Sequence, residues 1–198
     1  MSLNSSPNDK FPETTSSKLS FGHCQECATP LQQQRPPGDD RLRLVCPNCN
    51  KVFYDNPKLV VGCVPISKDQ NRVLLGKRAY PPIGKWTIPA GFLESGETAH
   101  QGAAREAWEE MRAELDLQPL TILAMYNVIP AKQVQILYRS TLLNEAHVQP
   151  GPEMQEVRMF EWNQIPWDQL AFPTVEWALR YSLHNLNNKH LQPQLKSK

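Results

Sequence analysis

The sequence predicts an α+β fold, a sandwich built on a mixed sheet, with a small cysteine-rich module ahead of it. Three observations predict this arrangement. Strand-like apolar runs stand before and after a capped helix, a second amphipathic helix follows the last strand, and four of the five cysteines form two C-x-x-C pairs near the N-terminus. Strands and helices that alternate in this way bury their apolar faces against one another in layers.

The first segment, residues 1–21, is rich in Ser, Thr and Pro and has no hydrophobic period, so we expect a disordered tail. A transit peptide is usually Arg-rich and poor in acids, whereas this segment has no Arg and contains Asp9 and Glu13. The chain has neither a charged-then-apolar signal nor an apolar run of about 18 residues. We therefore expect a cytoplasmic protein with no membrane partner.

Residues 22–55 contain Cys24-x2-Cys27 and Cys46-x2-Cys49 with eighteen residues between the pairs. This spacing is typical of a tetrahedral four-cysteine zinc site, and we predict a zinc ribbon. A segment this short buries little core, whereas structural zinc supplies about 10–16 kcal/mol in isolated finger peptides. Four thiolates leave no open position for catalysis, so we expect the zinc to be structural; a redox role is the weaker alternative.

The main domain is expected over residues 56–185, after a hinge at Asn56-Pro57. Residues 59–66 form a continuous apolar run, as in a strand covered on both faces, and residues 72–78 form a second strand. Further strands are expected within 115–129, 133–143 and 151–162, a closing helix over 174–181, and a flexible tail over 186–198.

The central helix has a clear start signal. Thr98 is a good N-cap, and Gln101 three positions later completes a capping box, which predicts that the helix begins at Ala99.

Three glutamates share one face of that helix. Glu106, Glu109 and Glu110 are spaced i, i+3 and i+4, so their carboxylates lie within an arc of roughly 100°. Like charges this close repel, whereas Mg²⁺ or Mn²⁺, which prefer oxygen ligands, would turn the repulsion into a binding site. For a bare E-x-x-E-E the simpler interpretation is a solvated acidic helix. Arg105, four residues before Glu109, can orient it by an ion pair.

The context favours the metal site. The stretch from Gly91 to Ala113 reads G-x5-E-x7-R-E-A-x-E-E-x-R-A, which closely resembles the Nudix box of nucleoside-diphosphate hydrolases. The preceding W-x-x-P-x-G resembles the strand that enters the Nudix loop. The resemblance implies a Nudix α/β/α sandwich with a mixed sheet, and a pyrophosphohydrolase.

One departure stands out. The family's glycine after the glutamates is Arg112 here. That glycine normally supplies the left-handed residue that ends a helix. An arginine can adopt the same conformation at a cost of roughly 1–2 kcal/mol, or the helix can run on. No carboxylate is lost, so we still expect catalysis.

The resemblance assigns catalytic roles. Divalent ions on Glu106, Glu109 and Glu110 would polarise the phosphoryl group and lower the pKa of a bound water. Arg105 belongs to the catalytic set, and Glu97 assists directly or braces the helix through Arg105.

A further carboxylate from outside the box is expected, and similar enzymes imply Glu153 or Glu156. We favour Glu156 as a metal ligand and catalytic group, although both could be exposed loop charges.

Candidate substrate contacts are Arg78, Gly91, Phe92 and Tyr126. The two aromatic residues fit a core role equally well, and a solvated strand end is as plausible for Arg78 as a phosphate contact.

The substrate class follows from a second resemblance, over residues 24 to about 183, to zinc-ribbon FAD or ADP-ribose pyrophosphatases. NADH pyrophosphatases carry an S-Q-P-W-P-F-P-x-S run after the box, which this chain lacks. We therefore predict cleavage of FAD or ADP-ribose to AMP plus FMN or ribose 5-phosphate.

Related enzymes are commonly dimers, which implies a homodimer.

Three alternatives remain open: a NADH or capped-RNA pyrophosphohydrolase, a nucleic-acid-binding ribbon protein, and a catalytically silent regulator. A net charge of +1 argues against a broadly basic nucleic-acid-binding surface. The intact glutamates argue against the silent regulator, which Arg112 motivates.

Overall fold

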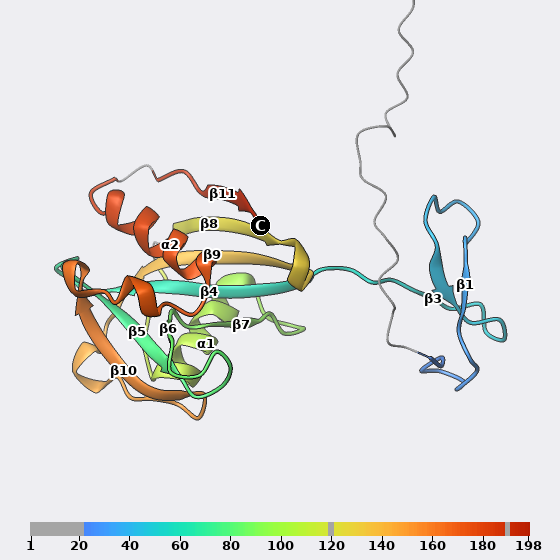
Figure 1. Cartoon of the computed structure of the whole chain (residues 1–198), viewed down its shortest axis with the longest axis horizontal. Coiled ribbons are helices and arrows are strands. Elements are labelled where there is room, and N and C mark those ends of the chain that lie inside the picture. The colour runs from blue at the N-terminus through green and yellow to red at the C-terminus, as the bar shows by residue number, and fades with distance from the viewer. Residues whose placement is uncertain (1–21, 119–120, 189–190) are drawn as a thin grey trace, which may run out of the picture. The chain divides into compact units, whose positions relative to one another are not determined.

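The computed structural model describes residues 22–118, 121–188 and 191–198 (Figure 1). The chain divides into two compact units, Met1–Asn56 and Pro57–Lys198. The expected disordered tail, residues 1–21, lies outside the described residues. No helix among the described residues has the length and apolarity needed to cross a membrane.

The first unit is a small antiparallel sheet of three strands within its described part. Strand β2 (Arg43–Val45) lies between β1 (Gln32–Gln34) and β3 (Val52–Phe53). Its buried apolar side chains outside the cysteines are Leu44 and Val45, so the sheet alone provides very little core.

The second unit is built on a mixed sheet of eight strands among the described residues. Its main path runs β10-β5-β4-β9-β8-β11, with β6 paired to β5 and β7 to β4. The β4–β9 and β8–β11 pairs are parallel and the others antiparallel. The strands are β4 (Lys58–Ile66), β5 (Arg72–Arg78), β6 (Trp86–Thr87), β7 (Ala90–Phe92), β8 (Thr121–Val128), β9 (Gln133–Thr141), β10 (Met154–Glu161) and β11 (Gln194–Ser197).

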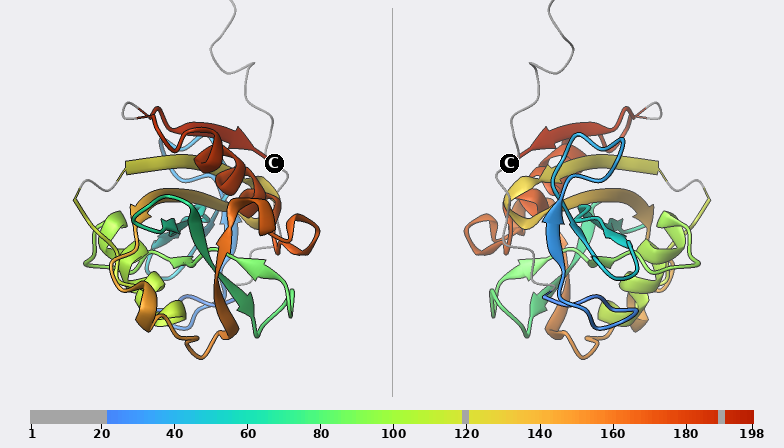
Figure 2. Two further views of the ribbon diagram at one scale, coloured as in Figure 1. Left: turned by 90° about the vertical axis from the view of Figure 1, so that its left-hand side faces the viewer. Right: turned by 90° about the vertical axis from the view of Figure 1, so that its right-hand side faces the viewer.

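Two α-helices cover opposite faces of this sheet (Figures 1 and 2). In β4, Val61 and Cys63 belong to the cluster packed with helix α1 (Ala99–Met111), whereas Val64 and Ile66 belong to the cluster packed with α2 (Pro173–His184). Alternate side chains of a strand point to opposite faces, which is why a continuous apolar run stands there. The predicted α+β sandwich with a mixed sheet is confirmed.

Helix α1 begins and ends at local signals. The Thr98 side chain accepts from the N–H of Gln101, and the Gln101 side chain accepts from the N–H of Thr98, so the predicted capping box is present. The helix ends because Arg112 adopts the left-handed conformation, with φ 51° and ψ 30°. Of the two outcomes left open for Arg112, the glycine-like conformation is the one found.

Short 3-10 turns complete the connections. They are η2 (Ile129–Ala131), η3 (Glu145–His147), η4 (Trp162–Gln164) and η5 (Trp167–Gln169). Pro130 lies in η2, in the turn between β8 and β9.

The C-terminal segment differs from the expected flexible tail. Residues 194–197 form β11, which pairs in parallel with β8. The Tyr126 hydroxyl donates to Oε1 of Gln194 over 2.7 Å, and the Tyr181 hydroxyl donates to the carbonyl of Gln192 over 2.6 Å. This strand is short and polar, so its residues show little strand pattern of their own. Residues 189–190 of the expected tail lie outside the described residues.

Candidate active site and zinc centre

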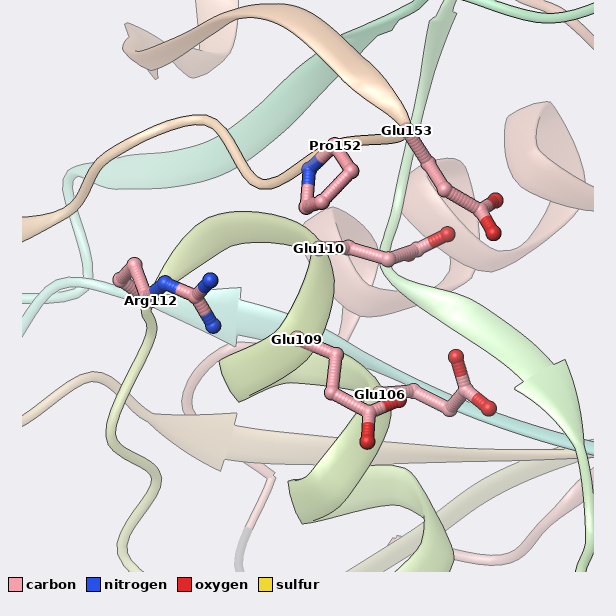
Figure 3. Close-up of a pocket in the computed structure, with 6 residues that line it drawn as sticks. All are labelled: Glu106, Glu109, Glu110, Arg112, Pro152 and Glu153. Carbon is pink, nitrogen blue, oxygen red and sulfur yellow. The ribbon is translucent and has the colours of Figure 1, made fainter.

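The glutamates of α1 open onto a pocket of about 300 Å³. It lies at the C-terminal half of the helix, where a loop from before β10 approaches (Figure 3). Its lining residues are Glu106, Glu109, Glu110, Arg112, Pro152 and Glu153. The structure thus brings together the three glutamates predicted on one helical face.

Arg105 ties the glutamates to the loop ahead of the helix. Its Nε and Nη2 donate to the two carboxylate oxygens of Glu97 over 3.0 and 2.8 Å. Its Nη1 donates to Glu106 over 2.7 Å and to Glu109 over 2.9 Å, and Nη2 also donates to the carbonyl of Phe92 over 3.0 Å. All five N–H groups of the guanidinium are therefore engaged.

The ion pairs explain the role of Glu97. The Arg105 guanidinium and the Glu94 N–H hold the pKa of Glu97 at about 2. A carboxylate committed to this fork braces the helix, which is one of the two roles expected for it.

Burial raises the pKa of two of the pocket carboxylates, in contrast to the lowered pKa of Glu97. Glu110 is 5% exposed, and its burial raises its pKa to about 8, although the N–H of Ala90 donates to Oε2 over 3.0 Å. Burial also raises the pKa of Glu106. A Cβ on Gly91 would lie 2.4 Å from the Glu106 carboxylate, so a larger residue there would displace that side chain.

The fourth carboxylate comes from the loop before β10. The N–H of Gln149 donates to the carbonyl of Met111 over 3.0 Å, and the N–H of Gly151 donates to the carbonyl of Glu110 over 2.8 Å. These carbonyls belong to the last turn of α1, where they have no partners within the helix. The loop therefore caps the end of the helix and carries Glu153 to the pocket.

The structure places the two candidate glutamates differently, and the metal-binding role expected for Glu156 stays a prediction. The Glu156 side chain does not line the pocket and instead forms an ion pair with Arg158 on its own strand. The register shifts between Met154 and Glu156, so strand pairing begins just after Glu153. The sequence could not separate the two glutamates, since the choice depends on how the loop docks.

The residues expected to contact the substrate differ in how exposed they are. Tyr126 is 0% exposed and packs edge-on against Trp177 at 5.4 Å between ring centroids, so it is a core residue and the expectation of substrate contact is corrected. Phe92 is 45% exposed, with Nζ of Lys58 lying 4.9 Å from its ring centroid.

Arg78, at the end of β5, has a buried Nε without a hydrogen-bond partner in the described part of the chain. Its Nη2 donates to the carbonyl of Pro81 over 3.0 Å, and its positive charge partly offsets the raised pKa of Glu110. Arg78 is therefore positioned at the edge of the glutamate cluster.

Two residues that line the pocket, Arg112 and Pro152, are not among those that the sequence predicts there. The sequence draws attention to Arg112 only through its effect on the helix end. The sequence signal that could have assigned Arg112 to the pocket is its position directly after the three glutamates, at the same end of the helix.

The donor set fits a hard divalent cation. The pocket presents carboxylate oxygens, which Mg²⁺ and Mn²⁺ prefer as ligands. Coulombic repulsion from Glu106 and Glu153 adds to the burial that raises the pKa of Glu110, and bound cations would relieve both. The residues that could hold such ions are Glu106, Glu109, Glu110 and Glu153.

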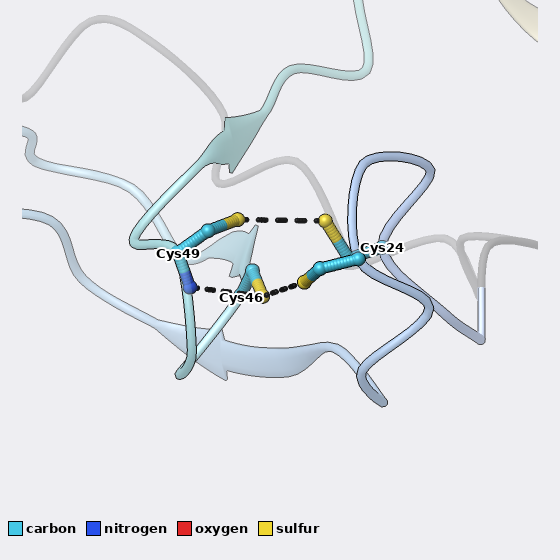
Figure 4. Close-up of side chains that lie close together, drawn as sticks. Cys24, Cys46 and Cys49 are labelled. Carbon is cyan, nitrogen blue, oxygen red and sulfur yellow. Dashed lines mark hydrogen bonds between the residues drawn. The ribbon is translucent and has the colours of Figure 1, made fainter.

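The four cysteines of the first unit also come together, and Figure 4 labels three of them, Cys24, Cys46 and Cys49. Their Sγ atoms all lie within 4.8 Å of one another, with 3.6 Å between Cys24 and Cys49 and 3.4 Å between Cys27 and Cys46. Zinc–sulfur bonds of about 2.3 Å in a tetrahedron place sulfurs about 3.8 Å apart, so the cluster fits zinc.

Two matching turns hold these thiols. The N–H of Ala28 donates to the carbonyl of Cys24 over 2.8 Å, and that of Asn50 donates to the carbonyl of Cys46 over 2.9 Å. Ala28 and Asn50 both have positive φ, of 56° and 58°. Each C-x-x-C pair is thus wrapped by one tight turn.

Comparison with known families agrees with both sites. The NUDIX domain family matches residues 56–181, and the Nudix N-terminal zinc ribbon family matches residues 23–55.

Among curated relatives, the NAD-capped RNA hydrolase NudC of Chromobacterium violaceum is 33% identical over 88 residues, 44% of this chain and 31% of the relative. The same-named protein of Photobacterium profundum is 33% identical over 72 residues, 36% of this chain and 26% of the relative. The aligned stretches thus span about a third or less of the length of these relatives.

Among solved structures, a NUDIX hydrolase from Nitrosomonas europaea superposes with a TM-score of 0.80 at 38% identity, covering 90% of this chain and 99% of that one. An ADP-ribose pyrophosphatase from Streptococcus suis superposes with a TM-score of 0.54 at 17% identity, covering 71% of this chain and 99% of that one, which shows the fold alone. With the NUDIX domain matched over more than half of its length and the glutamates of the box gathered at one pocket, the chain belongs to the Nudix family.

Proposed function

We propose that the protein hydrolyses the diphosphate linkage of a nucleotide derivative with the help of divalent metal ions. The observation that carries the proposal is the meeting of four glutamates from two separate segments, α1 and the loop before β10, around one pocket. A merely solvated acidic helix face does not require that a fourth carboxylate from another segment lie beside it.

In this proposal Glu106, Glu109, Glu110 and Glu153 hold Mg²⁺ or Mn²⁺. The bound ions supply positive charge for the phosphoryl oxygens and lower the pKa of a bound water. Arg105 is a positioning residue, since it fixes Glu106 and Glu109 through Nη1 while Glu97 fixes its other side. The hydrolysis adds one water across the P–O–P bridge, leaving a monophosphate on each side.

Substrate contacts in the proposal are Arg78, Gly91 and Phe92. The positive charge of Arg78, which acts on Glu110 at the edge of the glutamate cluster, would attract a phosphate oxygen, and exposed Phe92 offers a surface for a ring. Gly91 allows the substrate and the Glu106 carboxylate to share a narrow space.

The substrate we favour is FAD or ADP-ribose, giving AMP plus FMN or ribose 5-phosphate. The absence of the NADH-pyrophosphatase signature from the sequence supports this choice. A second candidate is NADH or an NAD-capped RNA, of which the capped RNA is supported by the name of the relatives from Chromobacterium violaceum and Photobacterium profundum. The four cysteines would bind a structural zinc, and the protein would act in the cytoplasm as a homodimer.

A substrate panel tests the proposal. FAD, ADP-ribose, NADH and an NAD-capped RNA are each incubated with Mg²⁺ or Mn²⁺, and products are separated by chromatography, with Glu109→Gln as the control. Release of AMP from FAD, ADP-ribose or NADH, or of nicotinamide mononucleotide from the NAD-capped RNA, supports the proposal if the variant abolishes it, and the fastest substrate decides between the two candidates. Absence of turnover with all four, in protein that retains its fold, would overturn it. Light scattering of the same sample tests the homodimer.

A further inference from the structure

Two arginines lie beside the glutamates of α1, and they are used differently. Arg105 has all five N–H groups engaged, mostly with carboxylates. Arg112 lines the pocket together with four glutamates, yet it forms no ion pair within the described part of the chain. A guanidinium that lies beside carboxylates but forms no ion pair with them is available to bind a different anion.

The side chain of Arg112 is held in place from within the chain. Its Nη1 donates to the carbonyl of Trp108 over 3.0 Å, and its guanidinium lies 5.6 Å from the centroid of the Trp108 ring. Figure 3 shows it beside the turn of α1 that carries Glu109 and Glu110. One N–H of the five is thus committed, and the remaining ones keep a fixed direction, which lowers the entropy cost of binding.

The backbone at this position would suit glycine better. With φ 51° the residue is left-handed, a conformation that L side chains reach only at a cost. A helix can end here without an arginine, so ending the helix does not explain the side chain.

We propose that Arg112 is a substrate-binding residue that binds a non-bridging phosphate oxygen of the substrate's diphosphate directly. The planar guanidinium presents paired N–H groups that match phosphate geometry. The inference rests on the proposed function of the same pocket. It adds a contact to the substrate that the protein makes directly, without the metal ions.

The test compares binding with turnover. The probe is α,β-methylene-ADP, a nucleoside diphosphate analogue whose P–C–P bridge resists hydrolysis, titrated calorimetrically in the presence of Mg²⁺. Variants are Arg112→Gly and Arg112→Lys. The matched control is Gln70→Gly, which relieves a second left-handed residue, with φ 61°, in the turn between β4 and β5.

For Arg112→Gly we expect affinity for the probe to fall about ten- to hundred-fold, the range of a charged hydrogen bond. KM for the turned-over substrate should rise by a similar factor while kcat changes little. Arg112→Lys should retain part of the affinity, and Gln70→Gly all of it. Thermal stability should not fall in either glycine variant.

The outcomes separate the two proposals. If Arg112→Gly binds the probe as the wild type does, Arg112 is only a helix cap and the inference is wrong, whatever the turnover. If the wild type binds the probe through Arg112 but hydrolyses no diphosphate, the inference stands and the proposed function fails. A wild type that does not bind the probe overturns the inference, whereas the substrate panel alone decides the proposed function.

Discussion

The backbone N–H of Gly151 donates a hydrogen bond to the carbonyl oxygen of Glu110 over 2.8 Å. This bond joins the loop that carries Glu153 to the helix that carries the other three glutamates. The site is therefore assembled by backbone contacts at a helix end, where the last carbonyls lack partners within the helix. The position of the fourth carboxylate therefore depends on how this loop docks against the helix.

Gly151→Ala tests this dependence. A Cβ at that position would lie 1.9 Å from the carbonyl oxygen of Glu109, so the loop would have to move away from the helix. We expect kcat to fall at least about tenfold, because a displacement of about 1 Å at a catalytic site can cost roughly 10²-fold. Steady-state kinetics and thermal unfolding of the variant measure both effects. Gly22→Ala, where nothing lies within 4 Å, is the control. Unchanged kcat would show that the loop's docking is irrelevant to catalysis.

The two candidate glutamates can be separated directly. Glu153→Gln removes a carboxylate that lines the pocket, and we expect activity to fall about 10- to 100-fold with weaker Mn²⁺ binding. Glu156→Gln removes only an ion pair with Arg158 at the surface, which contributes about 0–1 kcal/mol, so activity should stay near that of the wild type. Activity assays with a manganese titration decide, and the reverse ranking would restore Glu156 to the site.

The pairing of Glu97 with Arg105 predicts a pH dependence of stability. The pKa of Glu97 is held at about 2, below its usual 4.5. A carboxyl whose folded pKa is depressed stabilises the fold above its unfolded pKa, and that contribution is lost as the pH falls towards about 2. We expect Glu97→Gln to be less stable than the wild type at about pH 7, with the difference shrinking below about pH 4.5. Urea unfolding of metal-free protein across this range measures it. A difference that stays constant with pH would contradict the prediction.

Removal of the ribbon's zinc should affect one unit and spare the other. The first unit buries little apart from its cysteines, Leu44 and Val45, so Cys46→Ala should abolish zinc binding and expose the ribbon to trypsin. Cys63→Ala is the matched control, since Cys63 is buried in β4 and burial raises the pKa of its thiol. Zinc content and proteolytic fragments are the readouts. Equal zinc loss in both variants would exclude the four-cysteine site.

Tyr126 should matter for stability and not for catalysis. Tyr126→Phe removes the hydroxyl that donates to Gln194 over 2.7 Å, and we expect a loss of about 1 kcal/mol in the free energy of unfolding. The values of kcat and KM should not change, because the residue is fully buried. Denaturant unfolding and kinetics together check this, and a raised KM would return Tyr126 to the substrate site.

The features that the sequence predicts are those that depend on residues close to one another in the chain. The first residue of α1 is predictable because Thr98 and Gln101 are three positions apart, and the glutamate face follows from helix geometry alone. The conformation of Arg112 is left open by the sequence because an arginine can either adopt the left-handed conformation or continue the helix.

The features that the sequence does not predict have a common cause. The choice between Glu153 and Glu156 depends on hydrogen bonds from Gln149 and Gly151 to a helix far away in sequence. Tyr126 follows a register shift in β8, so simple alternation cannot tell its buried side. Residues 194–197 become a strand only because β8 offers an edge with which they can pair.

That last pairing affects how the protein can be shortened or tagged. The N–H of Lys198 donates to the carbonyl of Asn127 over 2.9 Å, and its carbonyl accepts from Ile129 over 3.1 Å, so these residues cover the backbone of β8. Truncation before residue 191 would uncover a strand edge beside the exposed side chains of Ile122 and Met125. Bare edges of this kind template intermolecular pairing. A C-terminally trimmed form would therefore be prone to aggregate while its catalytic pocket remained intact.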